Sequence, residues 1–328
     1  MKPAARTVRF IAPSLFRMPK SMAHTNYPII AISDPGGERS EPMGTKRKFW
    51  STWDNQRWLF KYNRPDHGED WSEKIAAELG RLLQIPCATV QLARCADSPG
   101  VVSRNFINDF PSGSRLVHGN ELLTQHYGRS YPSERSFHVS EHCVSAVKHI
   151  LAQLPAPQGV AGLSAGSVKT LWDAFAGYLM LDALIGNTDR HHENWGIITV
   201  DGGGGVATLA PSFDHASSLG RELDDIARKD MLEARGTRSV DLYAKRCRSK
   251  LYFASGDAKP LSPLEAFVEA TRGGEDVRRY WLEKLELAQE SDFKHIIERV
   301  PEERMSADAK DFAFKLLMCN MKMLLDVD

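Results

Sequence analysis

Short runs of apolar and β-branched residues, separated by turn residues, dominate the chain between residues 27 and 107. Runs of this kind predict β-strands. The expected strands are Pro28–Ile32, Lys48–Ser51, Arg57–Tyr62, Ala88–Ala93 and Gly100–Ile107. Between the third and the fourth of them, apolar residues recur at helical spacing from Trp71 to Leu83, which predicts a single helix.

After Pro111 the apolar residues recur mostly at helical spacing. Ser140 is expected to cap a helix that runs toward Leu154, and a longer helix is expected over Ser167–Leu184. The longer helix is apolar on almost all sides, which indicates that it is buried. Further helices are expected at Ser262–Thr271, Asp276–Gln289 and Ser306–Leu325, and two short strands at Trp195–Val200 and Val206–Ala210.

These patterns divide the 328 residues into two unequal parts, and the length suits one bilobed unit. We expect an α+β fold in which residues 27–108 form a small β-rich lobe with one helix. Residues 109–328 are expected to form a larger, mainly helical lobe. Residues 1–26 are basic and lack the long apolar core of a secretory signal, so they are predicted to form a disordered tail.

The charges of the chain balance, with 42 Lys and Arg residues against 42 Asp and Glu residues. Proteins that bind nucleic acid usually carry a basic excess, so direct nucleic-acid binding is not expected. No apolar run approaches the roughly 20 residues of a membrane helix, so no membrane association is expected. The five cysteines are scattered and form no C-x-x-C pair, which favours reduced thiols in the cytoplasm.

The most informative stretch follows the long helix and reads G-N-T-D-R-H-H-E-N-W. It places Asp189 and Asn194 five residues apart, and Asp214 follows after the expected hairpin. Phosphoryl transfer needs one carboxylate that orients the attacking hydroxyl and accepts its proton, and an Asn and a second Asp that hold Mg²⁺. The protein-kinase catalytic loop has the same Asp–Asn spacing, so a bilobed protein-kinase-like fold is expected.

Two residues of the first lobe extend this set. Lys61 ends an expected strand, where a lysine that pairs with phosphates should lie. Glu73 lies twelve residues later, in the first turns of the expected helix, and is the candidate partner of Lys61. Glu78 is the alternative partner. A lysine at the end of a strand is ordinarily a surface residue. Here Lys61 and Glu73 precede Asp189, Asn194 and Asp214 in the order that a kinase requires, which favours a phosphate-binding role for Lys61.

Other polar clusters have simpler interpretations. The histidines His191, His192 and His215 suggest zinc, but there is no H-E-x-x-H pattern, so a metalloprotease is not expected. His191 is expected to brace the catalytic loop, and the other two histidines to be non-essential. Gly202–Gly205 resembles a phosphate cradle, but no helix N-terminus follows it, which favours a hairpin tip.

The sequence also resembles the HipA-type serine/threonine kinases, in the single-domain branch without a separate N-terminal subdomain. The resemblance covers roughly residues 27–325. The motifs that carry it are G-T-K-R-K-F-W (Gly44–Trp50), W-L-F-K (Trp58–Lys61), W-S-E-K (Trp71–Lys74), V-H-G-N-E-L-L (Val117–Leu123), G-N-T-D-R-H-H-E-N-W (Gly186–Trp195) and L-A-P-S-F-D-H (Leu209–His215).

The resemblance implies a protein kinase that uses ATP and Mg²⁺. By position, Asp189 resembles the catalytic aspartate, Asn194 and Asp214 resemble the Mg²⁺ ligands, and Lys61 resembles the nucleotide lysine. Met43–Lys48 resembles the phosphate loop, and the expected cofactor-binding residues are Gly44, Thr45, Lys46, Lys48, Lys61 and Glu73. Some relatives phosphorylate aminoacyl-tRNA synthetases, and many are toxins paired with an antitoxin. A translation-related protein substrate and an antitoxin are therefore the partners that the resemblance implies.

The expected phosphate loop departs from the family pattern. Several relatives autophosphorylate a serine just before the loop glycine, but here residues 41–43 precede Gly44 and the nearest serine is Ser40. A phosphate on Ser40 or Thr45 would repel the phosphates of ATP or capture the lysines of the loop, so we expect it to inhibit. The alternative is that both are ordinary turn residues.

Two other functions stay open at this point. D-R-H-x-x-N is also the catalytic-loop pattern of phosphoinositide kinases, which allows a lipid or small-molecule kinase. Long basic insertions would favour that function, and the sequence has none. The other function is an inactive nucleotide-binding module, for example one that neutralises a toxin. Loss of a catalytic residue would favour it, yet Asp189, Asn194 and Asp214 are all present.

Overall fold

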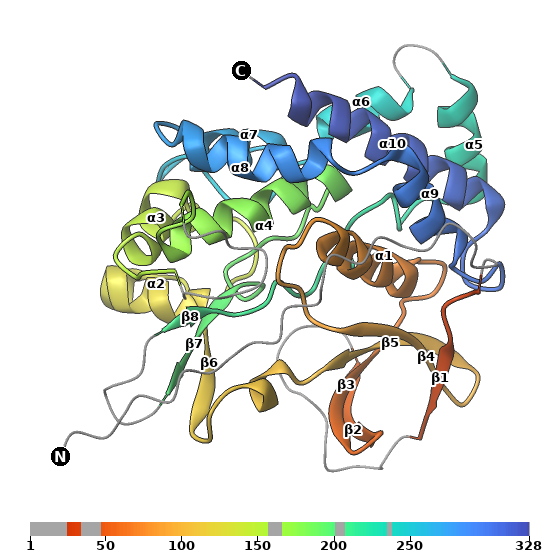
Figure 1. Ribbon diagram of the computed structural model, residues 1–328, viewed down its shortest axis with the longest axis horizontal. Helices are drawn as coiled ribbons and strands as arrows, with labels where there is room; N and C mark the ends of the chain where they lie inside the picture. The colour runs from red at the N-terminus through yellow and green to blue at the C-terminus, as the bar shows by residue number, and fades with distance from the viewer. Residues whose placement is uncertain (1–24, 34–46, 157–165, 201–206, 235–237, 328) are drawn as a thin grey trace.

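A five-stranded sheet forms one side of the molecule and helices occupy the other (Figure 1). The computed structural model describes residues 25–33, 47–156, 166–200, 207–234 and 238–327. The strand order is β1-β4-β5-β3-β2, in which β1 runs parallel to β4 and all other neighbours are antiparallel. The strands are β1 (Ile29–Ile32), β2 (Lys48–Trp53), β3 (Gln56–Tyr62), β4 (Val90–Cys95) and β5 (Ser98–Arg104).

The hairpin of β2 and β3 turns at Asp54 and Asn55, which have φ angles of 50° and 56°. Two successive residues with positive φ are typical of the tight turn that matches the twist of a hairpin. Asp and Asn tolerate this conformation better than other non-glycine residues. Trp53 therefore pairs with Gln56, and the expected pair of strands is confirmed, with both strands extended to the turn.

The helical lobe is built around α4 (Leu171–Ile185), which is buried along almost its whole length as the sequence predicts. A capping box starts it: Thr170 Oγ1 accepts the N–H of Asp173, and the Asp173 carboxylate accepts the N–H of Thr170. Within the described ranges, no helix has the length and apolar character that a membrane span requires. The other helices are α2 (Gly119–Tyr127), α3 (Val144–Leu151), α5 (Asp225–Glu233), α6 (Val240–Arg246), α7 (Pro263–Ala270), α8 (Glu275–Glu286), α9 (Glu290–Glu298) and α10 (Ala307–Leu325).

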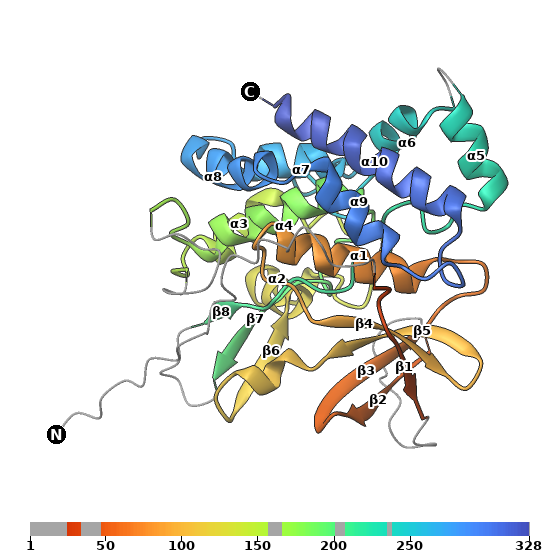
Figure 2. The ribbon, with the colours of Figure 1, turned by 45° about the vertical axis from the view of Figure 1, so that its right-hand side comes forward.

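Helix α1 (Glu69–Leu82) lies between the sheet and the helical lobe (Figures 1 and 2). It contacts β4 and β5 on one side and α4 and α9 on the other. Ile75 and Leu79 are fully buried, as the helical spacing of the sequence predicts. The helix that the sequence predicts for the small lobe therefore belongs to the interface between the two lobes.

A second, smaller sheet has the order β6-β7-β8 and consists of β6 (Ser114–His118), β7 (Gly196–Val200) and β8 (Thr208–Leu209). The hairpin of β7 and β8 was expected, although its tip at residues 201–206 lies outside the described residues. Strand β6 was not expected. Gly196 allows β6 to approach, because a Cβ atom there would lie only 2.4 Å from the carbonyl oxygen of Val117.

Several boundaries differ from the sequence predictions. The strand expected to reach Ile107 ends at Arg104, and the chain continues as the 3₁₀ turn η1 (Phe106–Asp109). The cause is local, because the side chain of Asn105 accepts the N–H of Ile107 and caps the turn. Another 3₁₀ turn, η2 (Gly128–Ser130), follows α2.

Some helices also differ from the predictions. Helix α3 begins at Val144, and Ser140 instead accepts a hydrogen bond from the N–H of Gly256. Helices α5, α6 and α9 were not expected. They have nine, seven and nine residues. In α9 the buried residues Phe293, Ile296 and Ile297 do recur at helical spacing, so the signal for this helix was present in the sequence and was missed.

We expect Gly177→Ala in α4 to destabilise the protein. A Cβ atom at this position would lie 2.5 Å from the indole of Trp281, which is fully buried. Overpacking costs about 1–3 kcal/mol, which exceeds the gain of up to about 1 kcal/mol from the better helix propensity of alanine. Urea unfolding measures the change, with Gly166→Ala as the control because no atom lies within 4 Å of its Cβ position. Equal stability of the two variants would contradict the expectation.

Candidate active site

The loop after α4 begins with a turn at Gly186, which has a φ of 65° and ends the helix. Glycine adopts this left-handed conformation without strain. The N–H of Gly186 and that of Asn187 both donate to the carbonyl oxygen of Asp182. The side-chain amide of Asn187 also donates to Asp182 Oδ1 at 2.8 Å. Asp182 therefore fixes both the backbone and a side chain at the start of the loop.

The same Asp182 forms a bidentate ion pair with Arg190 across the loop. Nε of Arg190 lies 2.7 Å from Oδ2 and Nη2 lies 2.8 Å from Oδ1. Burial by itself lowers the pKa of Arg190, but the carboxylate of Asp182 raises it by more, so the guanidinium stays charged. The two parallel hydrogen bonds also fix the plane of the guanidinium group.

Arg190 uses its remaining N–H groups to hold two further segments. Nη1 donates to the carbonyl oxygen of Asn194 at 2.5 Å and makes a longer contact of 3.5 Å with that of Phe213. Nη2 donates to Ser212 Oγ at 3.0 Å. One buried side chain thus connects α4, the end of the loop of Asp189 and Asn194, and the segment that leads to Asp214.

Asp189 and Asn194 lie together in the loop. The side-chain oxygen of Asn187 accepts the N–H of Asp189 at 3.0 Å, and Nδ2 of Asn194 donates to the carbonyl oxygen of Asp189 at 2.7 Å. Asn194 is buried and Asp189 is half-buried. Because the amide nitrogen of Asn194 is engaged, its Oδ1 is the side-chain atom suited to hold a cation.

Asp214 lies next to Lys61, with 3.1 Å between its Oδ1 and the Nζ of Lys61. It has a φ of 59°, a left-handed conformation that is uncommon for a non-glycine residue but that Asp tolerates better than most. The preceding Phe213 anchors this segment, because its ring packs against the rings of Phe106 and His118. The carboxylate of Asp214 is thereby held toward the sheet.

Lys61 belongs to β3 and is buried. Burial lowers the pKa of Lys61, but the carboxylates of Asp214 and Glu73 raise it by more, and the net pKa lies above its ordinary value. The side chain is therefore a permanent cation facing two carboxylates. Lys48 stands directly opposite Lys61 in the register of the hairpin, so both side chains lie on one face of the sheet.

Glu73 lies in α1 and is almost completely buried, and its charge contributes to the raised pKa of Lys61. In this structure the direct ion pair of Lys61 is nevertheless with Asp214. The alternative partner, Glu78, is engaged elsewhere, with its Oε1 2.6 Å from the Nζ of Lys74. Of the two glutamates that the sequence offers as partners, Glu73 is the one whose charge raises the pKa of Lys61.

Polar contacts fasten the first turns of α1 to the helical lobe. Sequence reasoning missed all of them, because the partners lie 146 to 234 residues away along the chain. The contacts are Arg221 with Glu69 at 2.8 Å, Arg304 with Asp70 at 2.8 Å, and Ser72 Oγ with the carbonyl oxygen of Ser218 at 3.0 Å. They fix the helix that carries Glu73 relative to the helical lobe.

The roles of Asp182 and Arg190 were also missed. One signal was available for Asp182, which is the acidic residue near the end of a helix that is otherwise apolar almost all round. A charge in such a position requires a buried partner of opposite sign. The nearest cation downstream, Arg190, is that partner.

The histidines next to the site have structural contacts. His192 Nδ1 forms a hydrogen bond with the hydroxyl of Tyr131, and His215 Nε2 with Ser212 Oγ. Burial lowers the pKa of His192 to about 4 and that of His215 well below its ordinary value, so both rings are neutral. The 3.9 Å approach of His215 to Glu73 is therefore not an ion pair.

The structure thus brings Lys61, Glu73 and Asp214 together, and links them through Arg190 to the loop of Asp189 and Asn194. An amide oxygen and a carboxylate are hard oxygen ligands, which is the donor set that Mg²⁺ prefers. Three of the expected cofactor-binding residues, together with Met43 of the expected phosphate loop and the regulatory position Ser40, lie outside the described residues. The three are Gly44, Thr45 and Lys46.

Two solved structures have a similar fold. One is the crystal structure of the proinflammatory kinase CtkA from Helicobacter pylori, with a TM-score of 0.65 and 18% sequence identity over 92% of this chain and 100% of that chain. The other is HipA in the complex of HipA, HipB and operator DNA of a toxin–antitoxin system from Shewanella oneidensis MR-1. That match has a TM-score of 0.50 and 12% identity over 88% of this chain and 65% of that chain.

No family model and no curated protein sequence matches the chain. At identities this low, the structural matches establish the fold alone. The expected bilobed, kinase-like α+β fold is confirmed, and it is the fold of the proteins that the sequence motifs resemble.

We expect Arg190→Met to destabilise the protein by about 3–5 kcal/mol, because it leaves the buried carboxylate of Asp182 without its charged partner. The double variant Asp182→Leu/Arg190→Met removes both charges and should be more stable than Arg190→Met alone. Urea unfolding, followed by tryptophan fluorescence, measures both. A single variant as stable as the wild type would show that the ion pair does not stabilise the loop.

Proposed function

We propose that the chain is an ATP- and Mg²⁺-dependent serine/threonine protein kinase of the HipA type. The proposal rests on one arrangement, in which Lys61 lies 3.1 Å from Asp214 while Arg190 ties the Asp214 segment to the loop of Asp189 and Asn194. In kinases, a lysine of this kind pairs with the α- and β-phosphates. The first Asp of the Asp–Asn–Asp set orients the substrate hydroxyl, and the Asn and the second Asp hold Mg²⁺. The kinase-like fold supports these assignments.

The proposed nucleotide site lies between residues 27–108 and residues 109–328, which we assign as the two kinase lobes. The adenine would lie against the connection at Arg104–Asn108. In this structure Lys61 pairs with the carboxylate of Asp214. When ATP binds, Lys61 would leave that carboxylate and pair with phosphate oxygens instead. Lys48 lies on the same face of the hairpin and adds positive charge for the phosphates. The remaining cofactor contacts are assigned to Gly44, Thr45 and Lys46.

Oδ1 of Asn194 and the carboxylate of Asp214 would hold Mg²⁺, which neutralises charge on the phosphates when it is bound. Glu73 keeps Lys61 charged and oriented from the side of α1. Asp189 would be the catalytic residue. Its carboxylate would orient the serine or threonine hydroxyl and accept its proton, while the γ-phosphoryl group passes to the hydroxyl oxygen and ADP leaves. The buried pair of Asp182 and Arg190 fixes the positions of this carboxylate and of the two cation ligands relative to one another.

We further assign a protein substrate, an aminoacyl-tRNA synthetase or another translation factor, and a cytoplasmic location. The support for a partner comes from the HipA neighbour, which belongs to a toxin–antitoxin system together with HipB. By analogy, this chain would be the toxin of such a pair and would bind an antitoxin. The balanced charge of the chain gives no support for direct binding of nucleic acid.

Asp189→Asn should lower phosphoryl transfer by about 100-fold or more, because an amide does not accept the proton of the attacking hydroxyl. The test is transfer of label from γ-labelled ATP with Mg²⁺, with and without cell lysate. Asp311→Asn, an exposed aspartate of α10, is the matched control and should keep full activity. Near-native transfer by Asp189→Asn would rule out its assignment as the base, and no transfer by the wild type would favour an inactive nucleotide-binding module.

Asp214→Ala should weaken the binding of a non-hydrolysable ATP analogue in Mg²⁺ by at least about tenfold, because a metal ligand is lost. In the absence of Mg²⁺ the same variant should bind the analogue no more weakly than the wild type. The reason is that Lys61 no longer has to leave a carboxylate. Calorimetric titration with and without Mg²⁺ gives both affinities, and an unchanged Mg²⁺ dependence would argue against the metal role of Asp214.

A further inference from the structure

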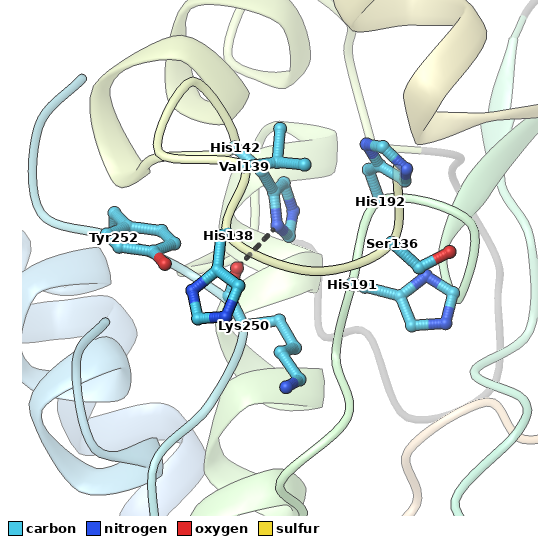
Figure 3. Close-up of a pocket in the computed structure, with 8 residues that line it drawn as sticks. All are labelled: Ser136, His138, Val139, His142, His191, His192, Lys250 and Tyr252. Carbon is cyan, nitrogen blue, oxygen red and sulfur yellow. Dashed lines mark hydrogen bonds between the residues drawn. The ribbon is translucent and has the colours of Figure 1, made fainter. Parts of the chain in front are cut away.

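A small cavity lies beside the catalytic loop (Figure 3). Its volume of about 10 Å³ suits one water molecule or a bare ion rather than an organic ligand. None of the described residues assigned to nucleotide, Mg²⁺ or proton transfer lines it. Side chains from three segments surround the cavity, and four of them are histidines, namely His138, His142, His191 and His192.

His142 has a structural role in this group. Its Nδ1 lies 2.9 Å from the carbonyl oxygen of Lys250, the contact that Figure 3 draws as a dashed line. Its Nε2 accepts the indole N–H of Trp195 at 3.0 Å. Both ring nitrogens are therefore used, and His142 forms part of the wall of the cavity.

His192 is different, because one of its ring nitrogens is buried without a use. Its Nδ1 is bonded to the Tyr131 hydroxyl, whereas its Nε2 has no hydrogen-bond partner among the described residues. A buried polar atom left in this way costs about 1–3 kcal/mol. When the hydroxyl accepts the Nδ1 proton, Nε2 carries a lone pair. An imidazole with its other nitrogen bonded to an oxygen is the usual form of a metal ligand.

Two neighbours offer further ligand atoms. Those of His191, His192 and Glu193 all lie within 4.8 Å of one another. Nδ1 of His191 is 3.8 Å from Oε2 of Glu193, and Ser136 Oγ donates to the same oxygen at 3.2 Å. Ligand atoms around a tetrahedral ion with bonds of about 2.0–2.2 Å are roughly 3.4 Å apart. The present spacing of up to 4.8 Å is wider, so the side chains have to rotate to bind an ion. Nδ1 of His191 also accepts the backbone N–H of Glu193 at 3.2 Å, a hydrogen bond that an ion bound to this nitrogen would replace.

We propose that His191, His192 and Glu193 form a binding site for a transition-metal ion of the zinc class. Two imidazoles and one carboxylate are a ligand set of zinc sites that keep a fourth position for water. Nitrogen ligands favour Zn²⁺ over Mg²⁺, which separates this site from the oxygen donors of Asn194 and Asp214.

The proposed site also has a regulatory consequence, which rests on the proposed kinase function, whereas the binding itself does not. All three ligands lie between Asp189 and Asn194 in the chain. An ion that draws them together changes the spacing of the loop that holds the catalytic carboxylate. Zn²⁺ bound here therefore inhibits phosphoryl transfer.

Binding is tested by calorimetric titration of the full-length protein with Zn²⁺ in excess Mg²⁺, with the visible absorption of Co²⁺ as a second readout. One equivalent should bind, and His192→Gln and Glu193→Gln should each weaken binding at least about tenfold. The half-buried Glu193 keeps the test valid if the buried His192 variant does not fold. His149→Gln, an exposed histidine of α3, should bind as the wild type does. Absence of saturable binding, or wild-type affinity in Glu193→Gln, overturns the proposal.

Inhibition is tested by label transfer from ATP at fixed Mg²⁺ and increasing Zn²⁺. Phosphoryl transfer by the wild type should fall as Zn²⁺ fills the site. The Zn²⁺ concentration that halves transfer should be at least about tenfold higher for Glu193→Gln than for the wild type. Equal sensitivity of both proteins overturns the regulatory link. If Zn²⁺ binds as expected but the wild type transfers no label in Mg²⁺ alone, the kinase function fails and the metal site stands.

Discussion

The buried ion pair between Asp182 and Arg190 is the constraint on which the arrangement of the site depends. A guanidinium with no exposed surface is tolerated only where its charge and its hydrogen bonds are all met. Asp182 meets the charge, and the backbone of Asn194 and the hydroxyl of Ser212 accept further hydrogen bonds. The loop after α4 and the segment that leads to Asp214 therefore share one anchor and cannot shift independently.

Helix α1 applies a second constraint, between the two lobes. Its first turns are bonded to the helical lobe, through Glu69 and Asp70 among others. Further along the helix, Nζ of Lys74 donates to the carbonyl oxygen of Val90 in β4 at 2.9 Å. Because one rigid helix is bonded to both sides, it sets how far the sheet that carries Lys61 lies from the helical lobe.

The sequence predicted what depends on local pattern. The turn at Asp54-Asn55, the buried helix α4 and the bilobed α+β fold follow from turn chemistry, apolar spacing and motif order. Partners that are distant in sequence did not follow. The direct partner of Lys61 is Asp214 rather than Glu73, and the acceptors of Arg190 appear only after the chain has folded. The short strand β6 was missed because its pairing with β7, which is distant in sequence, determines it.

We propose that this framework holds a metal–nucleotide site between Lys61, Asn194 and Asp214. The most direct measurement is a crystal structure of the full chain with Mg²⁺ and a non-hydrolysable ATP analogue. The account predicts Mg²⁺ bound by Oδ1 of Asn194 and the Asp214 carboxylate, and Nζ of Lys61 moved from Asp214 to phosphate oxygens. It also predicts that the Asp182–Arg190 pair is unchanged. Nucleotide bound elsewhere, or bound with Lys61 still paired to Asp214, would contradict the account.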